Sequence, residues 1–494
     1  MQFGIKPFYY YQKGDIFYFA SEVKALLPFL SHLEADTDAL KDYLVFQLHL
    51  EGKTLYKGVN ELKQAHTLTI SDSKIEIEKY WEIFYNIDTY HTSKYFEEEL
   101  MSLIYKSVCM HMRSDVEIGS YLSGGTDSSI ISIIASKHNF KQLKAFTGRF
   151  SEEMYDETEY ARYVAKENNM LWYEEEITPA MFIANINKII YHLDYPVAGI
   201  GSFAQYQTSK LASRYVKTVL SGVGGDEIFG GYVRYLIAYF EQVIKGAIDD
   251  TLDNGNFVVT YESIIPNLKY LQNYKPLLKK FFSNEMFEDL NKRYFKLINR
   301  GDYEGEIKYN ELYNNYSPFE TFKEIFDSPN IGKESYFDKM THFDFKTLLP
   351  AVLHVEDRMS MANGIETRVP FLDSDIIELT ATIPADIKFK DGKLKNILLR
   401  CTDNILPDMV KNRKNKMGFP VPLNKWIKNE LKDFVIDTFS VGKKKQRQYF
   451  NYDKIINNIF TEKDFSRKTW GLLSIELWYQ EFYDKQTYFK NLIK

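Results

Sequence analysis

Tyr121-Leu122-Ser123-Gly124-Gly125-Thr126-Asp127-Ser128-Ser129 is the stretch that decides the fold of this chain. Apolar residues run up to Leu122, two glycines and an acid follow, and an apolar segment resumes at 130–134. This order predicts a buried strand, a glycine-rich loop and a helix. Glycines let the backbone approach an anion closely, and the amides that open the helix point toward it. The stretch therefore predicts a cradle for phosphate at the end of a strand.

A second interpretation of this loop is a solvated turn in which Asp127 or Ser128 caps the following helix. Paired glycines, an acid and two hydroxyls after a buried strand exceed what a cap requires, so we favour the phosphate cradle. It is not the common nucleotide-binding loop, because that pattern needs a lysine directly after its last glycine. The later stretch 222–227, Gly-Val-Gly-Gly-Asp-Glu, lacks the third glycine of a dinucleotide-binding fingerprint.

Short apolar runs alternate with helical patterns around the loop. Strands are expected at 116–122, 143–147 and 216–220, and a helical pattern follows each of them. Such alternation is typical of an α/β fold with a doubly wound parallel sheet. Residues 235–336 show an irregular helical pattern, which we interpret as a helical insertion.

The first 80 residues follow a different pattern. Aromatic segments at 8–11 and 16–20 flank the turn residues Lys13-Gly14-Asp15, which predicts a β-hairpin. A helix is expected at 38–46, with Thr37 as its cap, and another over 92–113. We expect a small β-rich unit at 1–80 and a larger domain at 92–494.

Composition excludes several classes of protein. A chain of 494 residues exceeds what one hydrophobic core usually organises. Its net charge of -6 provides no global field for nucleic acid or an acidic membrane surface. Two cysteines, Cys109 and Cys401, exclude a disulfide framework and a multi-cysteine zinc site. No uninterrupted apolar stretch is long enough to span a bilayer, and we expect a cytoplasmic protein without nucleic-acid or membrane partners.

Four further stretches accompany the loop: FGIKPFYY from Phe3, FASEVKALL from Phe19, LSGVGGDEIFGGY from Leu220 and DRMSMANGIETRVPFLD from Asp357. In this order they resemble the asparagine synthetase family of the glutamine-hydrolysing type, within the ATP-pyrophosphatase superfamily. The resemblance covers nearly the whole chain. It implies an ATP-pyrophosphatase domain at 92–494 and a remnant of a glutaminase (Ntn-hydrolase) domain at 1–80. It also implies amide synthesis through an acyl-adenylate with release of AMP and pyrophosphate, with aspartate and ammonia as the first choice.

The resemblance further implies roles for individual residues. Magnesium would bind Asp127 and Asp226, which both follow glycine-rich turns at strand ends. ATP would contact Leu122, Ser123, Gly124, Gly125, Asp127, Ser128, Ser129, Thr147, Ser221 and Gly222. Lys416 matches the lysine that contacts pyrophosphate, and Glu366 would orient the acceptor or take its proton. In simpler interpretations Asp226 caps a helix and Lys416 is a surface lysine. Arg358 and Arg368 are candidates to pair with carboxylates or phosphates, and a structural salt bridge explains Arg368 equally well.

Two departures from the family affect the substrates. Met1-Gln2-Phe3-Gly4 resembles a segment near the end of the glutaminase domain, so this sequence shows no glutaminase nucleophile; Cys109 fits a helix core instead. Either the chain is a fragment, or its nitrogen comes from free ammonia, another amine or a separate glutaminase. Val223 stands where asparagine-forming members carry an acid. Amidation of a sugar acid or peptide carboxylate, a catalytically weak ATP-binding scaffold and a homodimer all remain open.

Overall fold

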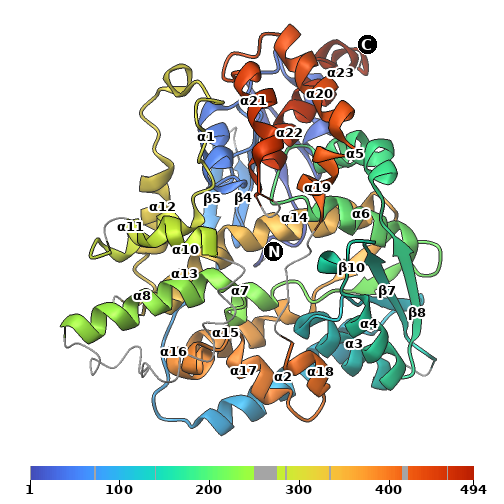
Figure 1. Cartoon of the computed structure of the whole chain (residues 1–494), viewed down its shortest axis with the longest axis vertical. Coiled ribbons are helices and arrows are strands. Elements are labelled where there is room, and N and C mark those ends of the chain that lie inside the picture. Colours follow the sequence, from blue (N-terminus) through green and yellow to red (C-terminus); the bar gives the residue numbers. More distant parts are fainter. Residues whose placement is uncertain are drawn as a thin grey trace.

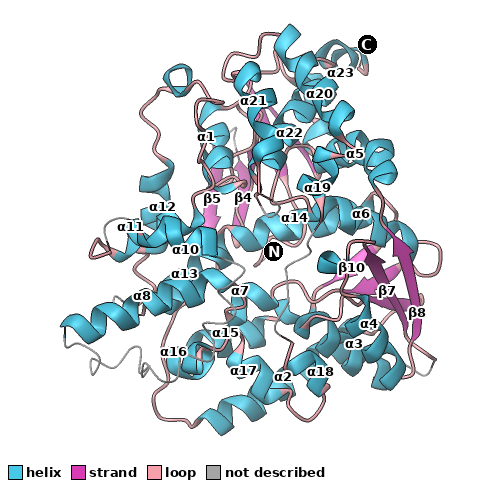
Figure 2. Ribbon diagram, viewed as in Figure 1, coloured by secondary structure: helices cyan, strands magenta, loops and turns pink. Residues whose placement is uncertain are grey.

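A computed structural model describes residues 2–71, 74–138, 141–249, 275–283, 286–332, 335–413, 421–463 and 466–493. A parallel sheet of five strands lies on one side of the molecule (Figure 2). Its strand order is β10 (Glu366–Arg368), β9 (Thr218–Leu220), β6 (Ile118–Tyr121), β7 (Lys144–Arg149) and β8 (Leu171–Glu176). The predicted α/β class with a doubly wound parallel sheet is confirmed. The sequence patterns had indicated β6, β7 and β9 but neither β8 nor β10.

Both faces of the sheet are buried, and successive strand residues alternate between them. In β7, Ala145 packs into one core and Phe146 into another, and in β9 Leu220 and Val219 divide in the same way. On the Ala145 face lie α2 (Ser93–His111), α3 (Thr126–His138) and α4 (Thr158–Glu167). On the Phe146 face lies α6 (Gly201–Ala212). Helices on both faces explain why these strands are apolar throughout.

The N-terminal segment forms a separate β-rich layer. The predicted hairpin is present as β1 (Tyr9–Lys13) and β2 (Ile16–Ala20), which pair antiparallel, and β3 (Asn60–Glu61) joins β1 on its other side. A second hairpin pairs β4 (His66–Ser71) with β5 (Lys74–Lys79). Between them lies α1 (Thr37–Phe46), whose cap is Asp36 rather than the predicted Thr37, because the Asp36 carboxylate accepts the Ala39 amide at 2.9 Å.

The N-terminal layer shares its hydrophobic core with helices from the far end of the sequence. Tyr9 and Tyr43 belong to the same cluster as Ile186 of α5 (Pro179–Leu193) and Trp478 of α22 (Lys468–Trp478). In Figure 1 the N-terminal elements and the C-terminal helices accordingly occupy the same end of the molecule, away from the parallel sheet. One core therefore joins residues that lie more than 400 positions apart, as the 431-residue separation of Tyr43 and Ser474 shows.

Helix α14 (Leu348–Met361) runs between the two halves (Figure 1). Ala351, Val355 and Met359 pack into the core of the N-terminal layer. Leu349 and Leu353, on another side of the same helix, pack into the core beneath the parallel sheet. The helix therefore contributes to both cores.

The remaining helices complete the outer layers. In the region expected as a helical insertion they are α8 (Val233–Asp249), α10 (Lys275–Phe282), α11 (Leu290–Ile298) and α12 (Pro318–Phe326), while 250–274 lie outside the described residues. The others are α7 (Gly225–Phe229), α13 (Tyr336–Lys346), α15 (Ser374–Thr382), α16 (Ala385–Lys388), α17 (Asn396–Cys401), α18 (Asp408–Lys411), α19 (Leu423–Lys428), α20 (Lys432–Lys444), α21 (Tyr452–Asn458) and α23 (Gln486–Asn491).

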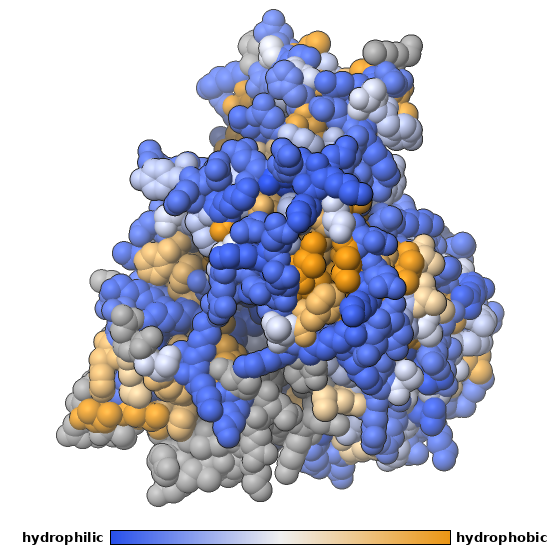
Figure 3. Space-filling view, turned by 45° about the horizontal axis from the view of Figure 1, so that its top comes forward, coloured by the Kyte–Doolittle hydropathy of each residue, from blue (hydrophilic) through white to orange (hydrophobic). Residues whose placement is uncertain are grey.

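Hydrophilic side chains cover most of the face shown in Figure 3, and hydrophobic side chains gather there in compact patches. Among the described residues, no helix has the length and apolar content needed to cross a membrane.

Candidate active site

Two glycine-rich turns meet at the carboxyl edge of the parallel sheet. One follows β6 and contains Asp127, and the other follows β9 and contains Gly222 and Gly225. A Cβ atom on Gly222 would lie 2.8 Å from the Asp127 backbone, and one on Gly225 would lie 2.6 Å from the Asp127 carboxylate. Only residues without side chains allow this approach. The glycines of the second turn are therefore required for the two turns to face each other.

The turn after β6 is held in shape by its own hydroxyls. The Ser128 hydroxyl accepts the Ser123 amide at 3.2 Å and lies 3.0 Å from the Ser123 hydroxyl. The Ser123 hydroxyl in turn accepts the Gly125 amide at 3.3 Å. Gly124 adopts the left-handed conformation, with φ of +73°. The loop is thus preformed at the start of α3, where helix amides favour an anion.

Arg413 supports this loop from outside. Its guanidinium donates to the Gly124 carbonyl at 3.4 Å and lies 4.2 Å from the ring centroid of Tyr160. It also forms an ion pair with Glu157. Because the side chain is almost fully buried, this cation is fixed beside the backbone of the phosphate loop.

Leu122 and Thr147 lie together, as expected for the ends of adjacent strands. The Thr147 hydroxyl donates to the Leu122 carbonyl at 2.6 Å, and the Trp172 indole donates to the Thr147 hydroxyl at 2.8 Å. Ser221 donates its amide to the Arg368 carbonyl at 2.8 Å, while Ser129 is buried on α3. The ten residues expected to contact ATP therefore lie on the two turns, on β7 and in the first turn of α3, at one edge of the sheet.

Asp127 and Asp226 are bridged by one lysine. Lys395, at the start of α17, forms ion pairs with the carboxylates of both residues, the second at 2.5 Å. The lysine is 4% exposed, and its backbone lies in the left-handed region with φ of 55°. Since one ammonium group contacts both acids, the two carboxylates lie close enough to share a cation.

This pair of carboxylates fits a magnesium ion that carries ATP. Mg²⁺ binds proteins through one or two carboxylates and keeps several waters and phosphate oxygens as its other ligands. In the described parts of the chain, no cluster of three or more His, Cys, Asp or Glu side chains could hold a metal ion.

Glu356 of α14 is a further acid beside the site. It is 6% exposed, and its carboxylate accepts the side-chain amide of Gln205 at 2.9 Å. Burial raises the pKa of the Glu356 carboxyl to about 8, although the nearby hydroxyls of Thr367 and Ser221 act to lower it. A carboxyl in contact with Ser221 that changes charge near neutral pH can accept or hold a proton.

The structure does not bring Glu366 to this edge. Glu366 opens β10 and pairs in register with Thr218, which opens β9, so it lies at the amino edge of the sheet. Its carboxylate is half exposed and pairs with Arg368 at 2.8 Å. Lys416 lies outside the described residues.

Both arginines of the motif 357–373 form structural contacts. Arg368 donates to the carbonyls of His111 and Arg113 at 2.7 and 2.8 Å, at the end of α2. Arg358 forms ion pairs with Glu22 at 3.3 Å and Asp194 at 3.4 Å. For Arg368 these contacts favour the structural interpretation, and Arg358 pairs with two carboxylates of the protein itself.

Sequence reasoning missed Lys395, Glu356 and Arg413. For Glu356 a signal existed, because Leu349, Leu353 and Glu356 follow the helical spacing of a buried stripe, and an acid in such a stripe is unusual. Lys395 stands in the segment 390–395, Lys-Asp-Gly-Lys-Leu-Lys, which holds three lysines, and no spacing distinguishes it from the other two. Arg413 lies among other basic residues in the segment 411–416, and its spacing does not distinguish it from them either.

Comparisons with known proteins agree with this geometry. The family described as Asparagine synthase matches residues 99–480, and the Glutamine amidotransferase domain matches residues 2–81. Asparagine synthetase [glutamine-hydrolyzing] 1 of Bacillus subtilis (strain 168) is 32% identical over 490 residues, which are 97% of this chain and 74% of that protein.

Two other relatives are more distant. A putative asparagine synthetase [glutamine-hydrolyzing] of Mycobacterium tuberculosis (strain ATCC 25618 / H37Rv) is 28% identical over 507 residues, covering 97% of this chain and 73% of the relative. Amidase chyE of Penicillium rubens is 23% identical over 428 residues, which are 79% of this chain and 61% of that protein. The Asparagine synthase match spans most of the chain and includes both glycine turns, Lys395 and Glu356. The chain therefore belongs to the asparagine synthase family.

Proposed function

We propose that this protein activates a carboxylic acid with magnesium ATP as an acyl-adenylate and transfers the acyl group to ammonia or another amine. Membership of the asparagine synthase family makes the chain an ATP-dependent carbon-nitrogen ligase. The observation that carries the finer proposal is the pairing of Asp127 and Asp226 through Lys395 beside a preformed phosphate loop. Aspartate and ammonia are the first-choice substrates.

In the first step the substrate carboxylate attacks the α-phosphorus of ATP, and the bond to the β-phosphate oxygen breaks. The amides at the start of α3 and the hydroxyls of Ser123 and Ser128 would hold the departing phosphates. Lys395 would stabilise the negative charge that grows on pyrophosphate. A magnesium ion held by Asp127 and Asp226 would supply further positive charge at the same oxygens.

In the second step the amine nitrogen attacks the acyl carbon, and the bond to AMP breaks. The attacking nitrogen must lose a proton. The ionised carboxylate of Glu356 is our candidate for the base that accepts it. A general base works best when its pKa lies near the operating pH, and the Glu356 pKa of about 8 meets that requirement. Its position near Ser221 of the nucleotide turn supports this role.

The identity of the carboxylate rests on weaker support. Relatives named asparagine synthetase favour aspartate. Val223, which replaces the acid expected in asparagine-forming members, favours amidation of another carboxylate such as a sugar acid or a peptide. A separate glutaminase as the nitrogen source and a catalytically weak ATP-binding scaffold are the remaining alternatives.

The test is carboxylate-dependent release of pyrophosphate. The purified chain, with magnesium ATP, ammonium and a mixture of candidate acids, should release pyrophosphate and form one amide that mass spectrometry identifies. Asp127→Ala should abolish the release, because it removes a magnesium ligand. Asp375→Ala removes a half-exposed acid that pairs with Lys106 and should leave the rate unchanged. Equal rates in the wild type and Asp127→Ala, or release that no acid stimulates, would refute the proposal.

A further inference from the structure

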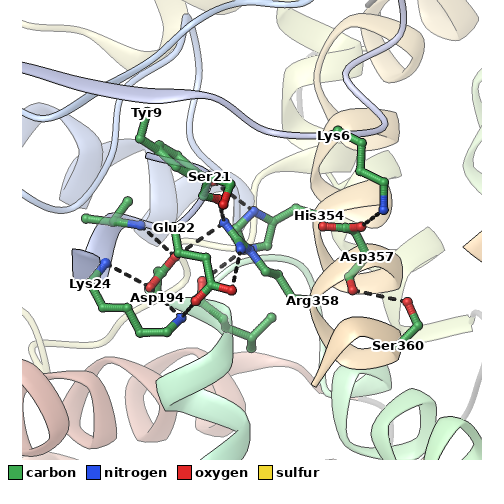
Figure 4. Close-up of polar contacts among 12 residues, drawn as sticks. Lys6, Tyr9, Ser21, Glu22, Lys24, Asp194, His354, Asp357, Arg358 and Ser360 are labelled. Atoms are coloured by element: carbon green, nitrogen blue, oxygen red, sulfur yellow. Dashed lines mark hydrogen bonds and ion pairs between the residues drawn. The ribbon is translucent and has the colours of Figure 1, made fainter. Parts of the chain in front are cut away.

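One turn of α14 holds three consecutive charged residues whose side chains contact three different parts of the molecule. Glu356 lies near Ser221 of the nucleotide turn and accepts the side-chain amide of Gln205 on α6 at 2.9 Å. Asp357 and Arg358 contact the N-terminal layer instead (Figure 4). Successive helix residues project about 100° apart, so one turn can reach three neighbours at once.

Asp357 is tied to the irregular segment that leads into β1. Its carboxylate forms an ion pair with Lys6, and the side chains are 10% and 39% exposed. The Ser360 hydroxyl donates to the Asp357 carbonyl at 3.1 Å, one helical turn further on. Lys6 therefore attaches the N-terminal segment directly to the residue that follows Glu356.

Arg358 makes the second attachment. It donates to the Ser21 carbonyl and forms ion pairs with Glu22 and Asp194. Asp194 is fully buried and accepts the amides of Val23 and Lys24 at 2.8 and 3.1 Å. Figure 4 shows these groups converging on the guanidinium from the N-terminal layer and from the end of α5.

These attachments determine where Glu356 lies. A helix that is anchored at two consecutive positions cannot rotate or slide without breaking a buried ion pair. The opposite sides of α14 are packed into two separate cores, through Val355 and Leu353, so the helix transmits a displacement rather than absorbing it. The position of the Glu356 carboxyl therefore depends on contacts with residues 6 and 21–24.

We propose that Lys6 and Arg358 are positioning residues of the amide-forming site, which hold α14 so that Glu356 meets the acyl group and the incoming amine. The proposal rests on the proposed function and extends it to residues outside the ATP site. Because they act through α14, their loss changes the rate of the chemical step more than the binding of ATP.

Lys6→Met is the most informative variant, because Lys6 is partly exposed and lies in no helix or strand. We expect its kcat for amide formation to fall about tenfold to a hundredfold, the effect of a misplaced catalytic group. The KM for ATP should stay within about twofold, since the phosphate loop is unchanged. Lys6→Arg should restore most of the activity, because it keeps the charge opposite Asp357.

Lys57→Met is the matched control. Lys57 lies in the same N-terminal layer and forms an exposed ion pair with Glu34 at 2.7 Å, without contact to α14. It should keep wild-type kcat and KM. Arg358→Lys is the second variant, and it should lower kcat in the same way while the melting temperature reports whether it folds.

The outcomes distinguish a failure of the positioning role from a failure of the proposed function. If the wild-type protein releases no pyrophosphate with any acid, the proposed function fails before any variant is compared. If the wild type is active and Lys6→Met keeps its kcat, or loses activity only through a higher KM for ATP, the positioning role is wrong. A loss that Lys6→Arg does not restore, or that Lys57→Met shares, would also contradict it.

Discussion

Gly124 is the residue at which the phosphate loop tolerates least change. Its φ of +73° lies in the left-handed region, and a Cβ there would stand 2.5 Å from the amide nitrogen of Ala161. Left-handed backbone costs a residue with a side chain about 1–2 kcal/mol. The contact with Ala161 adds a clash with backbone that cannot move away. Both effects act in the loop that is proposed to hold phosphate.

Gly124→Ala should therefore destabilise the protein by more than about 2 kcal/mol and raise the KM for ATP. Gly364→Ala is the matched control, because Gly364 has a similar φ of +68° with nothing within 4 Å of its new Cβ. Gly364→Ala should lower the free energy of unfolding by about 1 kcal/mol and leave the KM for ATP unchanged. Urea unfolding and steady-state kinetics measure both quantities. Equal losses in the two variants would show that the close approach to Ala161 has no effect.

At this scale the sequence predicted residues that belong to a continuous motif and missed those that come from elsewhere. Asp127, Ser128 and Gly124 stand in one stretch whose order alone indicates a phosphate cradle. Lys395 and Glu356 reach the same site from α17 and α14, and only the tertiary fold brings them there. Glu366 was chosen from its motif, but parallel pairing with Thr218 places it at the far edge of the sheet.

Among the elements, the contact of β10 with α2 shows what Arg368 does. The last carbonyls of a helix have no partner within the helix, and Arg368 donates to that of His111, the last residue of α2, and to the carbonyl of Arg113 just beyond it. The side chain also pairs with Glu366 on its own strand. Arg368 thus fastens an edge strand to the helix that lies beneath the sheet.

Arg368→Met should lower the free energy of unfolding by about 2 kcal/mol, because it removes charged hydrogen bonds to two carbonyls. The KM for ATP should not change, since the guanidinium points to α2 and not to the nucleotide turns. Arg400→Met removes an exposed ion pair between α17 and Glu97 and should cost less than about 1 kcal/mol. A large increase in KM for Arg368→Met would revive a phosphate-binding role.

Strand length decided which elements the sequence could predict. The hairpin of β1 and β2 has five residues on each side and a turn with glycine, and its position was predicted closely. β10 has three residues, Glu366 to Arg368, which is too short to show any alternation. β8 runs Leu-Trp-Tyr-Glu-Glu-Glu and its second half lacks an apolar pattern. Its place in the sheet follows from pairing with β7.

For the whole molecule, buried ionisable groups set the dependence of stability on pH. Burial raises the pKa of Glu61 to about 7 and that of Glu356 to about 8. The folded protein therefore keeps protons that the unfolded chain releases, so stability falls as pH rises toward these values. Burial lowers the pKa of His49 to about 4 and that of His342 to about 3. Unfolded histidines take up protons below about pH 6.5, so these residues affect stability only below that pH.

Between pH 6.5 and 8 the carboxyls dominate, and we expect stability to fall as pH rises. Glu356 alone contributes about 2 kcal/mol to this change, at about 1.4 kcal/mol per pH unit over 1.5 units. Glu356→Gln should reduce the slope by that amount in urea unfolding at the two pH values. Glu366→Gln, at a half-exposed position, is the matched control and should retain the wild-type slope. A slope that Glu356→Gln does not alter would contradict the assignment.

The core that joins both ends of the sequence has a consequence during synthesis on the ribosome. Tyr43 of α1 meets Ser474 of α22 across 431 residues, and both lie in the core that also holds β1. At about 5–20 residues per second, α22 emerges roughly 20 to 90 s after the N-terminal strands. During that interval the aromatic hairpin and α1 have no C-terminal helices to cover them. The nascent chain should therefore depend on holding chaperones until its last helices are made.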